Sequence, residues 1–436
     1  MRRLTLFLLD ISLLYASLLA MLGIRYDEIF YLQLRLHLLP FGIIFALWLL
    51  VFYIANLYDR HTFRNTPYFY SNLVRTIVAA GLISTSFFYL IPIFGITPKT
   101  NLFIFIALFA IFDTLGRSLF NHATTQSFKR ITLIVGNTSV AHETAEFINV
   151  NPQLGYKLAA IIQPDDIRGL KNSIREKHVH TIVISPEGYK MPELIDTFYQ
   201  ALSKRITFYD LSTFYERLTG RVPLGTIDQL WFLQNLTEDN KRGYEVAKRA
   251  GDIVFGLVFG AISALLYPFI SLGIALTSPG PVFYTQIRQG HLGRPFKIIK
   301  FRTMVANAEA STGAVWASTD DTRVTPFGRF LRRTRLDELP QFWTVIAGHI
   351  SLVGPRAERP EFHELLKKEV PFYEERYLIK PGLTGWAQIN YPYGSSVADA
   401  AEKLKYDLYY IKNRSFALDV GIILKTLRTA LSQAGN

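Results

Sequence analysis

Long apolar stretches separated by short polar loops fill the first quarter of the chain. Each stretch approaches the roughly 20 residues that a helix needs to cross the hydrocarbon core of a membrane. The first one lacks a small-residue cleavage site, so it is not expected to be a removable signal peptide. The pattern therefore predicts a bundle of four transmembrane helices within residues 1–122. The stretches are residues 4–24, 36–57, 77–96 and 102–120.

From residue 131 the pattern changes to short buried strands separated by helical stretches. Alternation of strands and helices in this order is typical of a sheet with parallel strands. It predicts a Rossmann-like α/β domain over residues 123–240. The predicted strands are residues 131–136, 157–162 and 181–185.

The turn after the first of these strands is a poor match to a dinucleotide-binding turn. Gly136 is present, but Thr138 and Ala141 stand where the later glycines would be. Without the second glycine the backbone cannot approach a pyrophosphate closely. We therefore expect a structural, regulatory or oligomerisation role for this domain, and no bound NAD.

A fifth apolar stretch, residues 253–276, contains Pro268 near its middle. Proline removes a backbone hydrogen bond and kinks a helix. Basic residues flank the stretch on both sides, so both flanks are predicted to be cytoplasmic. We predict a re-entrant helix over residues 241–280 that enters the membrane, bends at Pro268 and returns to the same face. The alternative is a plain fifth span, which would leave the basic remainder of the chain on the far side.

The composition indicates a membrane protein that carries soluble parts. Half of the 436 residues are hydrophobic and only 19% are charged, whereas an ordinary globular chain carries more charge. The formal net charge of +12 calls for anionic partners, and the apolar segments favour the lipid bilayer and phosphorylated substrates over nucleic acid. The chain has no cysteine, which excludes disulfides, a thiolate nucleophile and cysteine-ligated zinc.

Residues 329–356 hold the main candidate for chemistry. The adjacent acids Asp337 and Glu338 precede Arg356 and follow a cluster of cations. Neighbouring carboxylates repel each other, so keeping both ionised in a partly buried place requires cations or a metal ion nearby. Such a group suits phosphate chemistry, but a charge run by itself is more often a solvated helix end with internal ion pairs. The cations that precede the acids are Arg329, Arg332, Arg333 and Arg335.

Five strings between residue 248 and the C-terminus resemble one family. The resemblance is to the bacterial sugar transferases that act as polyprenyl-phosphate hexose-1-phosphate transferases, the monotopic phosphoglycosyl transferases. Four spans followed by a Rossmann-like domain look like the arrangement of the large members of that family. The strings are KRAGDIVFG, TSPGPVFYTQIRQGHLGRPFKIIKFRTM, DDTRVTPFGRFLRRTRLDELPQFWTVIAGHISLVGPR, KPGLTGWAQIN and YDLYYIKNRSFALDV.

The resemblance implies a reaction in which UDP-hexose and undecaprenyl phosphate give undecaprenyl-diphosphate hexose and UMP. This reaction begins exopolysaccharide or O-antigen synthesis. The family's Asp-Glu pair falls on Asp337 and Glu338. By that analogy Asp337 attacks the sugar-linked phosphorus and forms an aspartyl-phosphosugar intermediate, while Glu338 is a ligand for magnesium (Mg2+).

The resemblance also implies phosphate contacts and a location. Residues 281–436 are expected to form a mainly α-helical catalytic domain with interfacial helices, on the cytoplasmic face of the bacterial inner membrane. A homodimer and downstream glycosyltransferases are candidate partners. For Arg302, contact with anionic lipid headgroups is an equal alternative, as it is for Arg288 and Arg329. The expected phosphate-binding residues are Lys300, Arg332, Arg356 and Arg302.

Three other interpretations stay open. A glycosyltransferase that moves the sugar alone to a lipid acceptor would release UDP. An enzyme that uses Asp337 as a general base in a ternary complex would still release UMP. A membrane scaffold for polysaccharide assembly would release no nucleotide.

Overall fold

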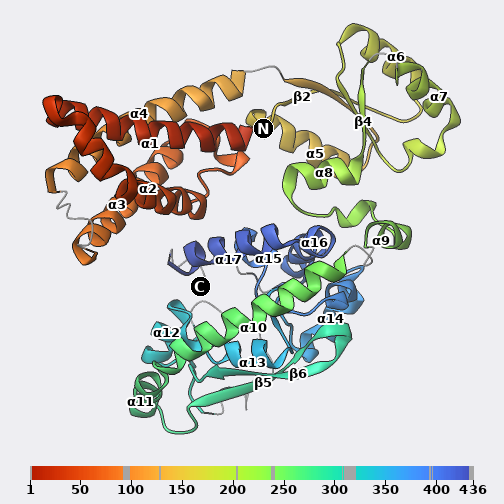
Figure 1. The fold of residues 1–436 in the computed structure, drawn as a ribbon. Helices are drawn as coiled ribbons and strands as arrows, with labels where there is room; N and C mark the ends of the chain where they lie inside the picture. Colours follow the sequence, from red (N-terminus) through yellow and green to blue (C-terminus); the bar gives the residue numbers. More distant parts are fainter. Residues whose placement is uncertain are drawn as a thin grey trace. The chain divides into compact units, whose positions relative to one another are not determined.

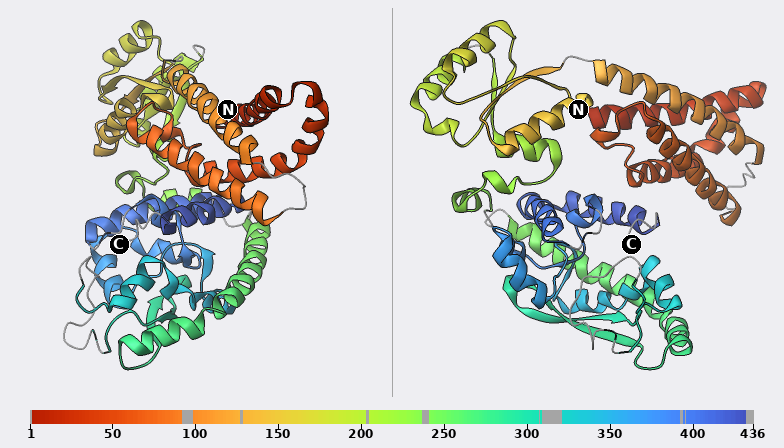
Figure 2. Two further views of the ribbon diagram at one scale, coloured as in Figure 1. Left: turned by 90° about the vertical axis from the view of Figure 1, so that its left-hand side faces the viewer. Right: turned by 180° about the vertical axis from the view of Figure 1, so that it is seen from behind.

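A computed structural model describes residues 2–91, 99–126, 129–202, 205–236, 241–306, 308, 321–391, 394 and 396–431. The chain divides into two compact units, Met1–Leu211 and Ser212–Asn436. Figures 1 and 2 show the elements of each unit. Residues 92–96 of the third predicted span and residues 237–240 of the predicted α/β domain lie outside the described residues.

The first unit begins with the predicted bundle of apolar helices. Within the described residues, four helices are long and apolar enough to cross a membrane, which confirms that part of the prediction. Thr66 caps the third helix and Pro67 occupies its first turn, an arrangement that favours helix initiation. The helices are α1 (Arg2–Arg25), α2 (Phe30–Ile54), α3 (Pro67–Leu90) and α4 (Lys99–Gln126).

Aromatic side chains and one buried ion cluster hold the bundle together. Trp48 of α2 packs edge-on against Phe109 of α4, with ring centroids 5.1 Å apart. Arg117 of α4 donates to Asp10 of α1 at 2.5 Å and to Asp113 one turn away at 3.1 Å. All three charged side chains are buried, and a charge in the hydrocarbon region is tolerated only when it is paired in this way.

A four-stranded parallel sheet completes the first unit. The strand order is β2-β1-β3-β4, and apolar side chains of β1 and β3 form a buried cluster with side chains of α6 and α7. Figure 1 shows α6 and α7 on one side of the sheet and α5 on the other. The elements are β1 (Arg130–Val135), α5 (Ser139–Val150), β2 (Tyr156–Ile162), α6 (Ile167–Glu176), β3 (Thr181–Ile184), α7 (Pro192–Ala201) and β4 (Thr207–Asp210).

The second unit begins with helical segments and a bent helix pair. Helices α10 and α11 meet at an angle of 53°, and Pro268 lies in the first turn of α11, so the predicted break is confirmed. Re-entry itself stays a prediction. The elements are α8 (Leu211–Thr219), α9 (Gln229–Asn235), α10 (Arg242–Ala264) and α11 (Tyr267–Thr277).

Two small β elements and short helices build the rest of the unit. Strands β5 (Phe283–Gln289) and β6 (Pro295–Phe301) form an antiparallel hairpin. Strands β7 (Ser351–Val353) and β8 (Gly382–Thr384) pair in parallel. A Cβ atom at Gly382 would lie 2.0 Å from the Gly354 nitrogen, so the backbones can approach closely only because this residue is glycine. The sequence pattern did not predict strands β7 and β8.

The remaining helices pack around these β elements. Gly256 of α10 lies against Ile346 of α13, which lets the two helices approach closely. Leu404 and Leu408 of α16 are fully buried in a cluster that also contains Val353 of β7. The helices are α12 (Pro326–Arg333), α13 (Gln341–Ala347), α14 (Pro360–Glu369), α15 (Trp386–Asn390), α16 (Val397–Asn413) and α17 (Phe416–Leu431).

Candidate functional site

The two adjacent acids lie in a single helical turn, η10 (Leu336–Glu338), between α12 and α13. Arg335 precedes the turn with a φ of 59°, an uncommon left-handed conformation for a residue other than glycine. Asp337 is only 7% exposed, and the Glu338 side chain is 12% exposed. The alternative of a solvated helix end is therefore wrong for these two side chains.

Glu338 is bound by two cations from other parts of the unit. Its Oε1 atom accepts from Lys300 Nζ of β6 at 2.8 Å and from Arg356 Nη2 at 2.9 Å. Burial opposes ionisation of Glu338, but the two cations outweigh it and hold the pKa well below its usual range. Burial also lowers the pKa of Lys300. The structure thus joins three of the predicted site residues in one charged group.

Asp337 is the poorly satisfied member of the acid pair. Its Oδ1 atom is buried and has no hydrogen-bond partner among the described residues. Burial, followed by repulsion from Glu338, raises the pKa of Asp337 to about 6, although nearby cations oppose the shift. A buried carboxylate oxygen without a donor keeps its lone pairs available, so Asp337 has the character of a nucleophile or a general base.

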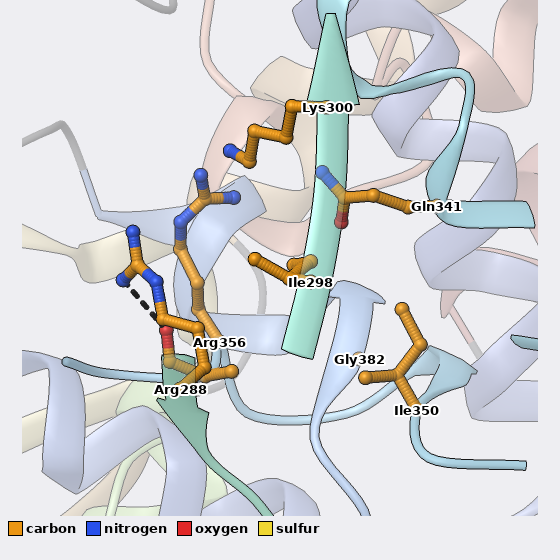
Figure 3. Close-up of a pocket in the computed structure, with 8 residues that line it drawn as sticks. Arg288, Ile298, Lys300, Gln341, Ile350, Arg356 and Gly382 are labelled. Atoms are coloured by element: carbon orange, nitrogen blue, oxygen red, sulfur yellow. Dashed lines mark hydrogen bonds between the residues drawn. The ribbon is translucent and has the colours of Figure 1, made fainter. Parts of the chain in front are cut away.

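A small pocket collects cations beside the acids. Figure 3 shows Arg288, Lys300 and Arg356 extending their nitrogen-bearing ends into the same space. None of the residues that line this pocket is acidic, so an anionic group would be attracted to it. The lining residues are Arg288, Ile298, Lys300, Gln341, Ile350, Arg356, Ala357 and Gly382.

Two of the lining residues change the picture obtained from the sequence. Arg288 of β5 was a weaker candidate, and its side chain is only 16% exposed. It donates to the Ala357 carbonyl at 3.1 Å, as Figure 3 shows. Gln341 was missed. It is 3% exposed, and its Nε2 atom has no partner among the described residues. Its place in the string LDELPQ was the only available signal.

The other predicted phosphate-binding arginines make different contacts. Arg332 donates to the Thr303 hydroxyl at 2.9 Å, and its charge lowers the pKa of Asp337. Arg302 is buried and donates to the carbonyls of Ser278 and Pro279 at 2.6 and 2.7 Å. The structure thus brings Arg332 into the acid site and uses Arg302 to hold the turn after α11.

A buried ion pair contacts the backbone of Arg356. Arg376 donates to the Arg356 carbonyl at 3.0 Å and to Asp407 Oδ2 at 2.8 Å. The side chains of Arg376 and Asp407 are 6% and 2% exposed. Since this pair is fixed by packing, it holds the Arg356 backbone in one place.

The donor set fits a magnesium ion that is shared with a substrate. Within the described residues, no three acids or histidines come together as a complete metal site. Magnesium commonly takes one or two carboxylates together with substrate phosphates and water. The carboxylate of Glu338 offers one such ligand. On binding the ion, Glu338 would lose part of its hydrogen bonding to Lys300 and Arg356.

Comparison with known proteins identifies the family. The model of the bacterial sugar transferase family matches residues 243–433, which include every site residue described above. The chain is 30% identical over 323 residues to a UDP-glucose:undecaprenyl-phosphate glucose-1-phosphate transferase of Escherichia coli. That match covers 69% of this chain and 67% of the relative.

Two further relatives match over shorter lengths. The UDP-N-acetylgalactosamine-undecaprenyl-phosphate N-acetylgalactosaminephosphotransferase of Aeromonas hydrophila is 40% identical over 237 residues, 53% of each chain. The UDP-glucose:undecaprenyl-phosphate glucose-1-phosphate transferase of Xanthomonas campestris is 39% identical over 199 residues, 45% of this chain and 41% of the relative. The chain thus spans about half the length of these two relatives. The match to the Escherichia coli relative extends well beyond the second unit, and the chain therefore belongs to the bacterial sugar transferase family.

Proposed function

We propose that this protein transfers hexose 1-phosphate from a UDP-sugar to undecaprenyl phosphate and releases UMP, as the first membrane step of polysaccharide synthesis. One observation carries the proposal: a buried Asp337 with an unpartnered oxygen lies beside Glu338, which two cations of the anion pocket bind. The activities for which the relatives are named support the same donor and acceptor classes.

The first chemical step uses Asp337 as the nucleophile. A carboxylate oxygen attacks the phosphorus that carries the sugar, and the bond from that phosphorus to the bridging oxygen of the diphosphate breaks. UMP leaves with the bridging oxygen and its electron pair. Asp337 then holds the sugar phosphate as an acyl phosphate. The unpartnered Oδ1 supports this assignment, because no described donor has to be displaced before attack.

The second step regenerates the enzyme. A phosphate oxygen of undecaprenyl phosphate attacks the same phosphorus, and the aspartyl oxygen leaves as a carboxylate. The product is undecaprenyl-diphosphate hexose, and no net proton is consumed. Two bulky substrates can then use one site in turn, which predicts ping-pong kinetics.

The surrounding cations hold the phosphate groups. Lys300, Arg356 and Arg288 line the pocket and would bind the diphosphate oxygens of the donor, for which the arginine fork is well suited. Arg332 supplies positive charge beside Asp337. Glu338 would hold a magnesium ion, which would supply charge neutralisation at the phosphate oxygens as UMP departs.

The membrane elements suit a reaction between a soluble and a lipid-bound substrate. We infer that α10 and α11 form the re-entrant helix, because basic residues flank the pair on both sides. The outward residues Val254, Val258, Phe269 and Leu272, all at least 49% exposed, suit contact with lipid. Such a helix would keep the site at the headgroup plane of the bacterial inner membrane, on the cytoplasmic face. The domain of residues 281–436 would carry the chemistry.

The parallel sheet of the first unit would be a Rossmann-like domain. Its order β2-β1-β3-β4 is that of doubly wound α/β folds. Gly136 has a φ of 143°, and a Cβ atom there would lie 2.3 Å from Ser185 Oγ. Thr138 caps α5 with its own side chain. A regulatory or oligomerisation role is proposed, with a second copy of the chain and downstream glycosyltransferases as partners.

The nucleotide product tests the proposal. Purified protein is incubated with magnesium, undecaprenyl phosphate and a panel of UDP-sugars, and the released nucleotide is identified. UMP is expected. Release of UDP would indicate a glycosyltransferase, and release of neither nucleotide would indicate a scaffold. Trapping a phosphosugar adduct on Asp337 would separate the covalent route from a ternary complex, which would give intersecting initial-rate lines.

A further inference from the structure

A second cavity, of about 370 Å3, lies within the unit Ser212–Asn436 and shares no lining residue with the catalytic pocket. Neighbouring residues of β7 and β8 separate the two spaces. Ile350 and Gly382 line the catalytic pocket, whereas Ser351 and Lys380 line the cavity. Its volume is within the range of small-molecule sites.

The cavity has a buried floor and an open rim. Asp252, Ser351 and Ile379 line it and are less than 10% exposed. Asp252 accepts from the Ser351 hydroxyl at 3.0 Å, so the polar groups of the floor are satisfied. Leu378, also a lining residue, is 44% exposed. A ligand could therefore enter from the rim without disturbing the floor.

The cavity carries a small excess of positive charge. Four lining residues are cationic and two are acidic. Lys248 pairs with Asp419 at 2.7 Å, and Arg414 pairs with Glu245 at 2.9 Å. Each of these two charges is therefore neutralised by an acid. The four cations are Lys248, Arg249, Lys380 and Arg414, and the two acids are Glu245 and Asp252.

Of the other two cations, Arg249 interacts electrostatically with the carboxylate of Asp252, so within the described residues Lys380 is the lining cation without an opposing acid. Arg249 donates to the backbone carbonyls of Val345 and Ile346 at 2.8 and 2.7 Å. These carbonyls satisfy its donors but carry no net charge. Lys380 lines the cavity, and the described part of the chain supplies no hydrogen bond or ion pair to its ammonium group. Lys380 is half-buried, and an ammonium group without a partner suits an anionic ligand.

Exposed apolar side chains lie beside this cavity. Asp252 is the last charged residue of α10, and the helix continues with the exposed side chains of Ile253 and Val254. Beside the rim, Leu292 at the tip of the β5–β6 hairpin is 59% exposed and has a φ of 55°. Leucine rarely adopts this conformation. Exposed leucines next to cations are typical of surfaces that dip into the headgroup region.

We propose that this cavity binds the phosphate headgroup of an anionic membrane phospholipid. The phosphate would accept from the Lys380 ammonium group, and the acyl chains would follow the apolar face of α10. A lipid headgroup and free phosphate carry the same anionic group, so both could bind Lys380. Only a lipid has acyl chains, which would gain binding energy from contact with Leu378, Ile253 and Val254. The proposal does not depend on sugar transfer.

The test measures lipid binding by the full chain. Purified protein in neutral detergent is titrated with phosphatidylglycerol, and the bound lipid is counted by native mass spectrometry. The same titration with phosphatidylcholine gives the background. We expect one phosphatidylglycerol to bind in preference to phosphatidylcholine. Lys380→Gln should weaken that binding about fivefold, the effect of one lysine near an anionic headgroup.

Two variants control the measurement. Lys367→Gln removes the same charge from α14, where Lys367 pairs with Glu374 and does not line the cavity; it should bind as the wild type does. Lys380→Arg keeps the charge and should retain binding, which separates a lost contact from a misfolded protein. Equal affinity of the wild type and Lys380→Gln would overturn the proposal. Full displacement of phosphatidylglycerol by millimolar inorganic phosphate would also overturn it, by assigning the cavity to a free anion.

Discussion

Arg376 and Asp407 form a buried ion pair at 2.8 Å, and the same guanidinium group donates to the backbone carbonyl of Arg356. Arg356 in turn binds Glu338. The pair thus fixes the position of a side chain that is proposed to bind the donor diphosphate, although neither of its members lines the catalytic pocket. Breaking a buried pair by removing one partner typically costs about 3–5 kcal/mol.

We expect Arg376→Lys to raise the KM for the UDP-sugar about tenfold, because lysine cannot bridge the acceptors that Arg376 joins and Arg356 loses its fixed backbone. The value of kcat should change less. Initial-rate kinetics with the folded variant measure both values. Arg414→Lys is the matched control, since Arg414 is equally buried and pairs with Glu245. Equal effects of the two variants on KM would contradict a positioning role.

Asp337→Asn should lower kcat at least about a thousandfold, as expected when a nucleophile is removed. Because burial disfavours the charged form of Asp337, the neutral amide should leave the melting temperature unchanged or raise it. Membrane insertion should be intact. Turnover and thermal unfolding are measured on the same preparation, and retained turnover would refute the nucleophile.

The value of kcat/KM should fall about tenfold per pH unit below pH 6. The reason is that Asp337 must be ionised to attack, and its pKa is raised to about 6. Arg332→Gln removes a cation that lowers this pKa, so the acid limb of the profile should move to higher pH. A profile that stays in place would show that another group titrates there.

The ionisation of Asp337 should also make the free energy of unfolding depend on pH, in a direction that its pKa shift determines. The folded-state pKa of Asp337 lies above its ordinary value of 3.8. Its contribution to stability is therefore fully present below pH 3.8 and is lost as the pH rises through about 6. In Asp337→Asn this part of the pH dependence should disappear. Chemical unfolding at several pH values measures the difference.

Removing magnesium with a chelator should stop turnover, and Glu338→Gln should raise the half-saturating magnesium concentration about 10- to 100-fold. The same variant leaves Lys300 and Arg356 without their shared carboxylate, so the melting temperature should fall. Rates are measured across a magnesium titration. An unchanged magnesium dependence would contradict the assignment of Glu338 as a ligand.

The re-entrant helix predicts that residues after α11 face the cytoplasm. The chain has no cysteine, so single labels need no background removal. Arg294→Cys, at the exposed hairpin tip, should react only from the cytoplasmic side. Basic residues at the start of α1 and around the second loop predict that both ends of the four-helix bundle face the cytoplasm. Tyr31→Cys, 81% exposed beside the first loop, should therefore react from the periplasmic side and serves as the control. Periplasmic labelling at residue 294 would establish a plain fifth span.

Local pattern was enough to predict much of the fold. Apolar length predicted the four spans, and strand-length runs predicted β1, β2 and β3. Pro268 predicted the break between α10 and α11. The pairing of Ser351 with Gly382 was not predictable, because the pairing depends on contacts between segments that are far apart in sequence. The short run around β8 therefore carried no signal that distinguishes a strand from a loop.

The site was predictable in its residue types and less so in its contacts. The resemblance placed Asp337, Glu338, Lys300 and Arg356 in one site. In the structure Lys300 binds Glu338, although the two residues are 38 positions apart in the sequence. Arg302 has the same chemistry as the other cations, and only tertiary structure shows that it holds the turn at Ser278. Gln341 is uncharged, so charge patterning could not detect it.

The buried cluster of Asp10, Asp113 and Arg117 has a consequence for how the protein is made. Asp10 and Arg117 are 107 residues apart in sequence, so the ribosome completes α1 long before it makes the arginine that neutralises Asp10. Helix α1 therefore acquires this partner only after α4 has been made. Biogenesis of this bundle must keep an unmatched aspartate away from lipid until the fourth helix arrives.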